Sequence, residues 1–298
     1  MISTVSISII TPSFQQGDFL ERMIASVTNQ SHPVIEHLIY DGGSTDRSIE
    51  ILRSAGKRVR WVSRPDGGQA NAVNQGLRSA TGEVIGWINS DDIYYPGALA
   101  SVAAAFAADP NLDVVYGEAD HIDVFDNPFE AYPTAPWDPE WLRHDCFICQ
   151  PALFFRRRVV DWVGVLDPDL HYCMDYNYWL RLAAQGCRFR FLPRKLAGSR
   201  LYASNKTLRD RAAVHHEIAR MFHSLEGSVP LRWVYAEARY RTLASIDEQR
   251  FPRRFAVGLM ANVLRNQWHW NRQPGVAALW DYAQCRRRHA GLVCSASS

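Results

Sequence analysis

Short apolar runs alternate with amphipathic helical segments along the first 110 residues. Runs rich in β-branched residues predict strands at residues 5–10, 35–40, 59–62 and 84–88. Apolar residues at helical spacing predict helices at residues 18–30, 48–53, 70–79 and 97–107, the first of them capped by Asp18. Alternation of strand and helix is typical of a parallel sheet covered by helices on both faces. The pattern therefore predicts an α/β fold with a mostly parallel sheet.

A polar cluster follows each of these strands. The clusters are Thr11-Pro12-Ser13, Asp41-Gly42-Gly43-Ser44, Asp66-Gly67-Gly68-Gln69 and Asn89-Ser90-Asp91-Asp92. Because parallel strands end at one edge of a sheet, we expect the clusters to converge on one pocket. The adjacent carboxylates of Asp91 and Asp92 repel each other, and Mg²⁺ or Mn²⁺ bridging to substrate phosphate would neutralise them. The alternative is that Ser90 or Asp92 caps the next helix.

Beyond residue 110 the pattern is less regular. A strand is predicted at 112–116, a loop-rich stretch with one hairpin at 117–137, and an edge-type strand at 150–155. An amphipathic helix at 175–183 carries Asp175 in its first turn, where the helix dipole favours a carboxylate, and directs Tyr178, Trp179 and Leu182 to the core. Further helices are predicted at residues 208–225, 231–246, 253–269 and 275–288.

Charge is distributed unevenly although the formal net charge is only +2. From Ser199 onward there are 16 Lys and Arg against 7 Asp and Glu, whereas the preceding residues are acidic. A basic tail suggests contact with phosphate, an anionic polysaccharide or a membrane face, and a solvated Arg-rich helical face explains it equally well. A membrane-surface helix would use Phe255, Leu259, Val263 and Trp268 with Arg253, Arg254 and Arg265. The alternative is packing on the sheet or against a second copy in a homo-oligomer.

Several classes of protein lose support from missing patterns. The sequence has no Gly-x-Gly-x-x-Gly after its first predicted strand and no P-loop, which argues against dinucleotide-binding and P-loop proteins, and no nucleic-acid partner is expected. Cys146 and Cys149 have CxxC spacing without a second pair, so neither zinc nor a disulfide framework is expected. No apolar run reaches the roughly 18 residues of a membrane span, and no signal peptide is visible. We expect a cytoplasmic protein, with peripheral attachment to the inner face of the membrane as the alternative.

The ordered motifs resemble a known family. Thr11-Pro-Ser-Phe14, Asp41-Gly-Gly-Ser-Thr-Asp46, Pro65-Asp-Gly-Gly-Gln-Ala-Asn71, Asn89-Ser-Asp-Asp92, Gln150-Pro-Ala152 and Met174-Asp-Tyr-Asn-Tyr-Trp179 together resemble the family 2 glycosyltransferases of the GT-A fold. The resemblance implies a Rossmann-like GT-A domain at 1–205 followed by a C-terminal helical region at 206–298. It also implies an inverting, metal-dependent enzyme that moves one sugar from a nucleotide diphosphate sugar, usually a UDP-sugar, to an acceptor hydroxyl. The acceptor would be a carbohydrate or a lipid-linked molecule in polysaccharide or glycoconjugate synthesis.

The resemblance also assigns roles to residues. Nucleotide contacts would come from Thr11, Pro12, Ser13, Asp41, Gln69, Asn71 and Asp91. Asp92, with Asp91 beside it, would hold Mn²⁺ or Mg²⁺, and Asp175 would be the general base, with nearby aromatic rings raising its pKa. Trp87, Gln150 and Tyr176 are expected on the acceptor and sugar side.

One departure from the family pattern affects the expected chemistry. Many relatives carry a histidine that completes the metal shell where this chain has Tyr202, and a neutral phenol is a poor ligand for these ions. We would then expect the ion to bind weakly, or Lys206 to assist the diphosphate. Tyr202 also motivates a second hypothesis, a catalytically inactive nucleotide-sugar binding or scaffold protein. A third, a nucleotidyltransferase, would need a basic Gly-rich loop after the first strand, and residues 11–18 are neither basic nor rich in glycine.

Overall fold

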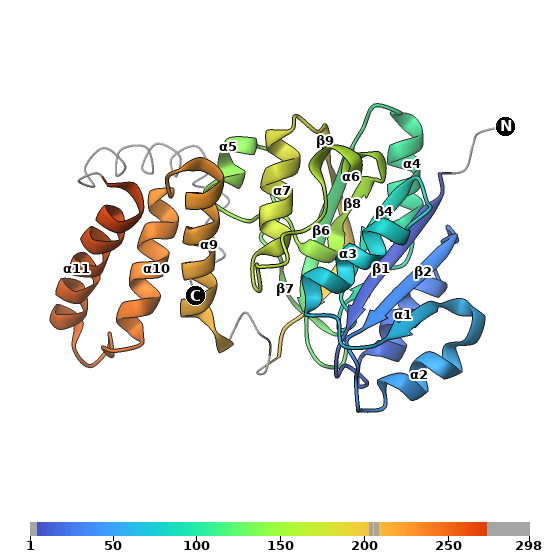
Figure 1. Cartoon of the computed structure of the whole chain (residues 1–298), viewed down its shortest axis with the longest axis horizontal. Helices are drawn as coiled ribbons and strands as arrows, with labels where there is room; N and C mark the ends of the chain where they lie inside the picture. The colour runs from blue at the N-terminus through green and yellow to red at the C-terminus, as the bar shows by residue number, and fades with distance from the viewer. Residues whose placement is uncertain (1–4, 203–204, 206–208, 273–298) are drawn as a thin grey trace. The chain divides into compact units, whose positions relative to one another are not determined.

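A computed structural model of the chain describes residues 5–202, 205 and 209–272 (Figure 1). The chain divides into two compact units. Unit 1 comprises Met1–Trp137 and Cys146–Tyr202, and unit 2 comprises Asp138–Asp145 and Ala203–Ser298. The candidate site residues predicted from the sequence all fall in unit 1, so its sheet is described first.

Unit 1 contains one mixed sheet. The first four strands of the chain are neighbours at one edge of this sheet, and they are parallel to one another. The spatial order is β3-β2-β1-β4-β8-β6-β9-β5, and β7 pairs with β6. The strands are β1 (Ile7–Ser13), β2 (Glu36–Asp41), β3 (Arg60–Ser63), β4 (Val84–Trp87), β5 (Ile93–Tyr94), β6 (Val114–Ile122), β7 (Pro128–Ala131), β8 (Leu153–Arg156) and β9 (Phe189–Arg200). The predicted α/β class with a helix-covered sheet is therefore confirmed.

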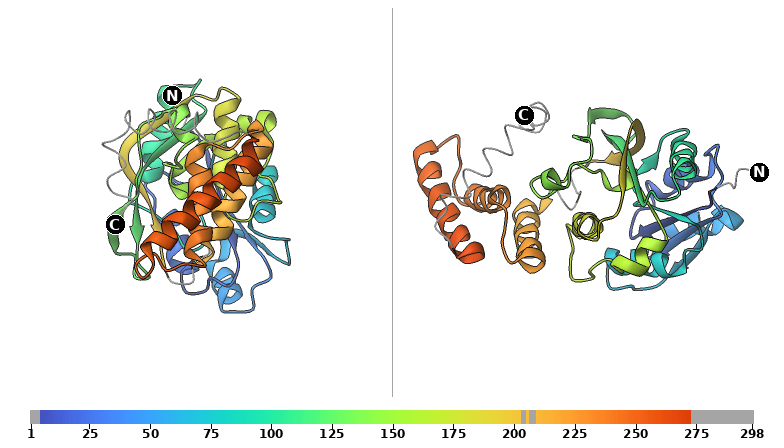
Figure 2. Two further views of the ribbon diagram at one scale, coloured as in Figure 1. Left: turned by 90° about the vertical axis from the view of Figure 1, so that its left-hand side faces the viewer. Right: turned by 90° about the horizontal axis from the view of Figure 1, so that it is seen from above.

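Helices cover both faces of this sheet, as Figures 1 and 2 show. They are α1 (Leu20–Thr28), α2 (Ser48–Ala55), α3 (Gln69–Ser79), α4 (Ala98–Ala108), α6 (Arg158–Val163) and α7 (Met174–Ala184). Side chains alternate between faces along a strand. Ile9 of β1 joins the core formed with α1, α2 and α4, while Ile10 faces Gly76 of α3. On the same face as α3, the Phe155 ring of β8 packs edge-on against Tyr178 of α7.

Four local expectations are corrected by the structure. β1 continues through Thr11, Pro12 and Ser13, which were expected to form a loop. Helix α1 begins after Phe19 without a side-chain cap, so Asp18 is not the cap. The strand predicted at 150–155 corresponds to β8. It is not an edge strand, because it pairs antiparallel with β4 on one side and with β6 on the other. The long strand β9, which pairs in parallel with β6, was not predicted at all.

The stretch expected to be loop-rich does contain the predicted hairpin. β6 and β7 pair antiparallel, and the turn between them is closed by the Asp123 carboxylate, which accepts hydrogen bonds from the backbone amides of Phe125 and Asn127 at 2.8 and 2.9 Å. Val124, Phe125 and Phe129 in or beside this turn are exposed. The hairpin therefore projects an apolar tip from the sheet.

Unit 2 is helical in its described part. It contains α5 (Pro139–Leu142), α9 (Arg211–Glu226), α10 (Leu231–Leu243) and α11 (Pro252–Asn271), which confirm three of the predicted C-terminal helices. The helix predicted at 275–288, Lys206 and the cysteines at 285 and 294 lie outside the described residues. Buried Glu237 accepts hydrogen bonds from His216, Arg241 and Trp270, which ties the three long helices together.

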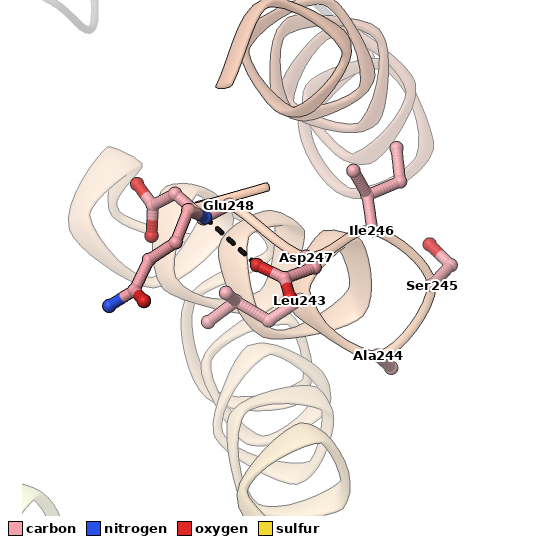
Figure 3. A pocket seen from close by; sticks show the side chains of 7 residues that line it. Leu243, Ala244, Ser245, Ile246, Asp247 and Glu248 are labelled. Carbon is pink, nitrogen blue, oxygen red and sulfur yellow. Dashed lines mark hydrogen bonds between the residues drawn. The ribbon is translucent and has the colours of Figure 1, made fainter. Parts of the chain in front are cut away.

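The turn between α10 and α11 encloses a shallow hollow of about 540 Å³ (Figure 3). Its wall is the turn itself, residues 243–249, and it contains none of the candidate site residues. No helix in the described part of the chain is long and apolar enough to cross a membrane.

Candidate functional site

Parallel pairing brings the four polar clusters to one edge of the sheet. Ser13 lies in register with Asp41, Asp41 with Ser63, and Ile10 with Trp87. Trp87 is followed by Ile88, Asn89 and Ser90, and then by Asp91. A hydrogen bond of 2.9 Å from Gln69 Nε2 to Asn89 Oδ1 joins the third cluster to the fourth. Residues separated by up to 80 positions in the sequence therefore converge, as the strand pattern predicts.

Asp41 is buried and organises the loop after β2. Its Oδ2 accepts hydrogen bonds from the backbone amides of Gly43 and Ser44 and from the Ser63 hydroxyl, at 3.1, 2.8 and 2.6 Å. Its Oδ1 accepts only the Ser44 hydroxyl, at 2.6 Å, among the described residues. A carboxylate oxygen has two lone pairs, so Oδ1 keeps an acceptor position for a ligand.

The three residues at the end of β1 differ in what their side chains can reach. Thr11 is fully buried, and its hydroxyl lies 3.0 Å from His37 Nε2 in β2. This differs from the predicted place in a base pocket, because β1 runs three residues further than predicted and directs Thr11 inward. Pro12 is also buried. The buried hydroxyl oxygen of Ser13 has no partner among the described residues, so Ser13 is the member of this set with an unused polar atom.

Sequence reasoning missed Phe14, the residue that follows this cluster. Its side chain is 58% exposed, and its ring edge lies close enough to Gly42 that a Cβ there would be 3.2 Å from it. The Asp66 carboxylate lies on the same side of Gly42. An exposed aromatic ring beside the Asp41 loop offers a flat surface on which a base can stack. The signal available in the sequence was a single aromatic residue directly after the polar cluster.

Asp91 and Asp92 lie beyond β4 and differ in accessibility. Asp92 is buried, and its Oδ1 accepts the backbone amide of Arg200 at 2.8 Å while its Oδ2 lies 3.4 Å from Asn89 Nδ2. Asp91 is half-buried, and its Oδ2 accepts the Tyr202 hydroxyl at 2.9 Å. Asp92 therefore links the loop to the end of β9, and Asp91 is the carboxylate nearer the surface.

A buried arginine holds this pair in place. Arg200 Nε donates to the Asp91 carbonyl at 2.6 Å, and the same guanidinium bonds the Asp123 carbonyl and the Asp126 carboxylate in the β6–β7 turn. The guanidinium also lies over the Phe19 ring, 4.6 Å from its centroid. One side chain thus connects β9, the Asp91 loop, the hairpin turn and the start of α1.

Burial raises the pKa of Asp91, although the Tyr202 hydroxyl and the Arg200 charge act in the opposite direction. Burial and the neighbouring charge of Asp91 raise the pKa of Asp92 well above its ordinary value. Negative charge at this position is therefore costly without a further cation. In the part of the chain that the structure describes, no group of three or more His, Cys, Asp or Glu side chains is arranged to hold a metal ion. The two carboxylates suit Mg²⁺ or Mn²⁺ only if phosphate oxygens and water supply the remaining ligands.

Asp175 lies in the first turn of α7, where its Oδ1 accepts the backbone amide of Tyr176 at 2.8 Å. The buried thiol of Cys149 locates it relative to the other acids. Burial first, and then the charges of Asp92 and Asp175 among others, raise the pKa of this thiol. A charge acts on a neighbour over a limited range, so Asp92 and Asp175 both lie within electrostatic range of the Cys149 thiol.

The residues expected on the acceptor side occupy the interior next to this point. Trp87 is buried, and its indole N–H donates to Asn89 Oδ1 at 3.1 Å. Gln150 is buried and donates to the Trp87 carbonyl at 2.6 Å, and Tyr176 is buried in α7. The Trp87 and Trp179 ring centroids are 6.5 Å apart, which ties β4 to α7. Trp87 and Gln150 therefore belong to the protein interior next to the site and do not form an open surface.

The third cluster begins α3. Gln69 is the first residue of that helix and bonds Asn89, as described above. Asn71 Nδ2 contacts the Gly67 carbonyl at 3.3 Å, and both side chains are half-buried. Gly67 and Gly68 have positive φ values of 77° and 115°, a region that favours glycine. The Gly68 amide donates to Asp66 Oδ1 at 2.8 Å, so this carboxylate closes the turn at the start of the helix.

Comparison with known proteins agrees with this geometry. An uncharacterised glycosyltransferase of Rickettsia typhi is 26% identical over 188 residues, which is 59% of this chain and 58% of the relative. The chain thus spans little more than half of that protein. The structure of Staphylococcus aureus TarS 1–349 in complex with UDP-GlcNAc matches with a TM-score of 0.59 at 15% identity, over 97% of this chain and 84% of TarS 1–349.

A second solved structure is the mannosyltransferase PcManGT of Pyrobaculum calidifontis in complex with GDP-Man and Mn²⁺. It matches with a TM-score of 0.58 at 18% identity, over 95% of this chain and 81% of that one. At these identities the two structures establish the fold. The model of the family named "Glycosyl transferase family 2" matches residues 8–164, more than half of the chain. With these motifs gathered at one sheet edge, the chain belongs to glycosyltransferase family 2.

Proposed function

We propose that this enzyme is an inverting, metal-dependent glycosyltransferase that moves one sugar from a UDP-sugar to an acceptor hydroxyl. The observation that carries the proposal is the gathering of Asp41, Asp91 and Asp92 at one sheet edge, together with the packing of α7, whose first turn contains Asp175, against β4. The UDP-GlcNAc complex of TarS and the GDP-Man and Mn²⁺ complex of PcManGT support a nucleotide-sugar donor and a divalent cation.

The nucleotide lies against the ends of β1, β2 and β3 in this proposal. The free acceptor position on Asp41 Oδ1 receives an N–H of the base, and the exposed Phe14 ring stacks on the base. The Ser13 hydroxyl and the side chains of Gln69 and Asn71 contribute further polar contacts.

Asp91, rather than the Asp92 that the resemblance implies, would hold the divalent cation. Asp92 is buried and its Oδ1 accepts the Arg200 amide, whereas the Asp91 carboxylate is half-buried. When bound, Mg²⁺ or Mn²⁺ would neutralise the negative charge that develops on the departing diphosphate. Asp92 keeps Asp91 in place through Arg200, which donates to both residues.

Asp175 is the general base in this proposal. Its carboxylate removes the proton from the acceptor hydroxyl as that oxygen attacks the anomeric carbon on the face opposite the diphosphate, and the bond to the diphosphate breaks with inversion. Such a base contributes about 10² to 10⁴ in rate. Trp179 and Trp87 fix the helix that carries it against β4.

Titration calorimetry of UDP in the presence of Mn²⁺ tests the binding half of the proposal. We expect binding by the natural sequence, a loss of about tenfold or more for Asp91→Asn, and unchanged binding for Asp18→Asn. Asp18 is an exposed carboxylate paired only with Arg47 among the described residues, which makes it a suitable control. Absence of UDP binding, or equal binding by Asp91→Asn, would refute the assignment.

The catalytic half is tested by UDP release from a panel of UDP-sugars. For Asp175→Asn we expect the rate to fall about 10² to 10⁴-fold while UDP binding is retained. Asp161→Asn is the matched control, because Asp161 is an exposed acid in the first turn of α6. If the natural sequence binds UDP but turns over none of the donors, the result would favour an inactive nucleotide-sugar binding protein. The observation that supports this alternative is the Tyr202 hydroxyl bonded to Asp91, where a metal-binding histidine is expected.

A further inference from the structure

Helix α11 turns apolar side chains outward on the side where a surface helix ordinarily carries charge. Val257, Met260, Leu264 and Trp268 are 73, 61, 57 and 61% exposed. At 3.6 residues per turn, these four positions fall within an arc of about 80°. They form one continuous apolar stripe along the helix, which is the red helix in Figure 1.

The opposite side of the same helix already has its partners. Phe255 and Trp270 are buried, the Arg239 guanidinium of α10 lies 5.5 Å from the Phe255 ring centroid, and Trp270 donates to Glu237 at 2.7 Å. The stripe expected from the sequence, which included Phe255, is therefore corrected. The inward side packs within unit 2, and Trp268 of the expected stripe faces out together with Val257, Met260 and Leu264.

Every charge on α11 is positive. The helix contains Arg253, Arg254 and Arg265 and no Asp or Glu. Arg253 falls within the arc of the apolar stripe, and Arg254 and Arg265 border it on one side. Over residues 209–272, unit 2 has 11 Arg against 6 Asp and Glu. A stripe of apolar side chains bordered by arginines is the pattern of a helix that lies in the interface of a membrane.

We propose that the outward face of α11 binds the surface of an anionic lipid membrane, with the apolar stripe among the acyl chains and the arginines at the lipid phosphates. A second copy is a poorer partner, because an isologous contact would place two stripes together with six arginines and no carboxylate from either α11. Lipid phosphates supply the missing negative charge. This surface is separate from the proposed transferase site and does not depend on it.

Flotation of the full chain with vesicles tests the proposal. We expect binding to phosphatidylcholine vesicles containing about one-third phosphatidylglycerol, and little binding to phosphatidylcholine alone. The double variant Val257→Ser with Leu264→Ser is expected to lose at least about tenfold in partition coefficient. Arg254→Gln with Arg265→Gln is expected to lose several-fold and to become less sensitive to salt. Phe125→Ser, at an exposed apolar residue of unit 1, is the control and should bind normally.

The residues altered on α11 are exposed, so the variants should fold, and circular dichroism with thermal melting verifies this. Equal binding of the natural sequence to neutral and anionic vesicles would overturn the proposal. So would unchanged binding by the Val257 and Leu264 double variant. Light scattering distinguishes a second copy as the partner. If the natural sequence does not bind vesicles and is a dimer, and the double variant is a monomer, the stripe is an interface between two copies instead.

Discussion

The Tyr202 hydroxyl joins two side chains near the proposed metal position. It accepts a hydrogen bond from Gln16 Nε2 at 3.1 Å and donates one to Asp91 Oδ2 at 2.9 Å. Burial, followed by the charge of Asp91, raises the pKa of this phenol, so it remains a donor at neutral pH. A phenol in this state fixes the direction of the Asp91 carboxylate without itself ligating an ion.

Removing this hydroxyl should weaken binding that depends on Asp91. For Tyr202→Phe we expect the Kd of UDP with Mn²⁺ to rise about tenfold or more, because a lost hydrogen bond to a charged group costs about 1.5 kcal/mol or more. Tyr202→His should bind Mn²⁺ more tightly than Tyr202→Phe, since imidazole is a better ligand. Calorimetry measures both, with Tyr116→Phe as the control because that phenol bonds the Ala135 carbonyl. A Kd for Tyr202→Phe equal to that of the natural sequence would contradict this role.

His37 introduces a pH dependence into the fold. Its ring is buried in β2, with Nε2 3.0 Å from the Thr11 hydroxyl and Nδ1 without a partner among the described residues. Burial lowers the pKa of His37 from 6.5 to about 3. The neutral ring is the folded form, whereas the unfolded chain takes up a proton below about pH 6.5.

The free energy of unfolding should therefore fall as the pH drops from about 6.5 towards 3, where the unfolded chain binds one more proton at this site. The slope is up to about 1.4 kcal/mol per pH unit, so the contribution between pH 7 and pH 5 is about 2 kcal/mol. Urea unfolding at both pH values should show a shallower dependence for His37→Gln than for the natural sequence. The exposed His269→Gln should follow the natural sequence, and identical slopes for all three proteins would show that His37 does not carry this dependence.

At the scale of elements, the strands and helices that local pattern controls were predicted, and those that pairing controls were not. α3 is observed at Gln69–Ser79 against a prediction of 70–79, because its apolar side chains recur at helical spacing. β9 contains arginines, a lysine and a proline and lacks a β-branched run, so pairing with its neighbours β6 and β5, and not local propensity, stabilises it. Arg200, which orders the acidic loop, lies at the end of that unpredicted strand, and its role was equally out of reach.

The same distinction applies to the site. The sequence predicted the convergence of the acidic clusters, because parallel strand ends must share an edge. It did not predict that Thr11 would turn inward or that Asp92 would be buried under the Arg200 amide. The first outcome depends on how far β1 extends, and the second on the position of the end of β9 beside the Asp91–Asp92 loop. Neither can be predicted from the local sequence pattern.

Contact between α3 and β1 leaves no room for a larger residue at Gly76. A Cβ there would lie 2.3 Å from Ile10 Cγ2, and Ile10 is fully buried. Alanine favours a helix over glycine by about 1 kcal/mol, but overpacking a core costs about 1–3 kcal/mol, and the second effect is the larger here. We expect Gly76→Ala to lower the free energy of unfolding by up to about 2 kcal/mol in urea titration, which is the overpacking cost less the gain in helix propensity.

Gly258→Ala is the matched control for this variant. Gly258 also lies in a helix, α11, but the nearest atom to its added Cβ is the flexible end of Ile246, at 3.0 Å. We expect this change to be neutral or slightly stabilising. Equal destabilisation by the two substitutions would mean that the α3–β1 contact is not the cause.

At the scale of the whole molecule, the candidate site and the lipid-binding stripe belong to different compact units. The principal hydrophobic core, built from strands and from α1, α2 and α4, lies entirely within unit 1, as do Asp41, Asp91, Asp92 and Asp175. Unit 2 packs its own buried residues, among them Phe222 and Trp233, whose rings stack at 6.3 Å. Ligands of one unit and of the other should therefore affect different parts of the chain.

Hydrogen exchange followed by mass spectrometry measures the effect of each ligand separately for each peptide of the chain. Ligand binding stabilises the folded state by about 2.7 kcal/mol at a hundredfold excess over Kd, and local opening of the contacted loops is suppressed most. With UDP and Mn²⁺ we expect slower exchange in peptides containing Asp41–Ser44 and Asn89–Asp92, and unchanged exchange across α9, α10 and α11. Anionic vesicles should slow exchange in α11 alone. Protection of α11 by UDP, or of the strand-end loops by vesicles, would show that the two activities are not confined to the units assigned to them.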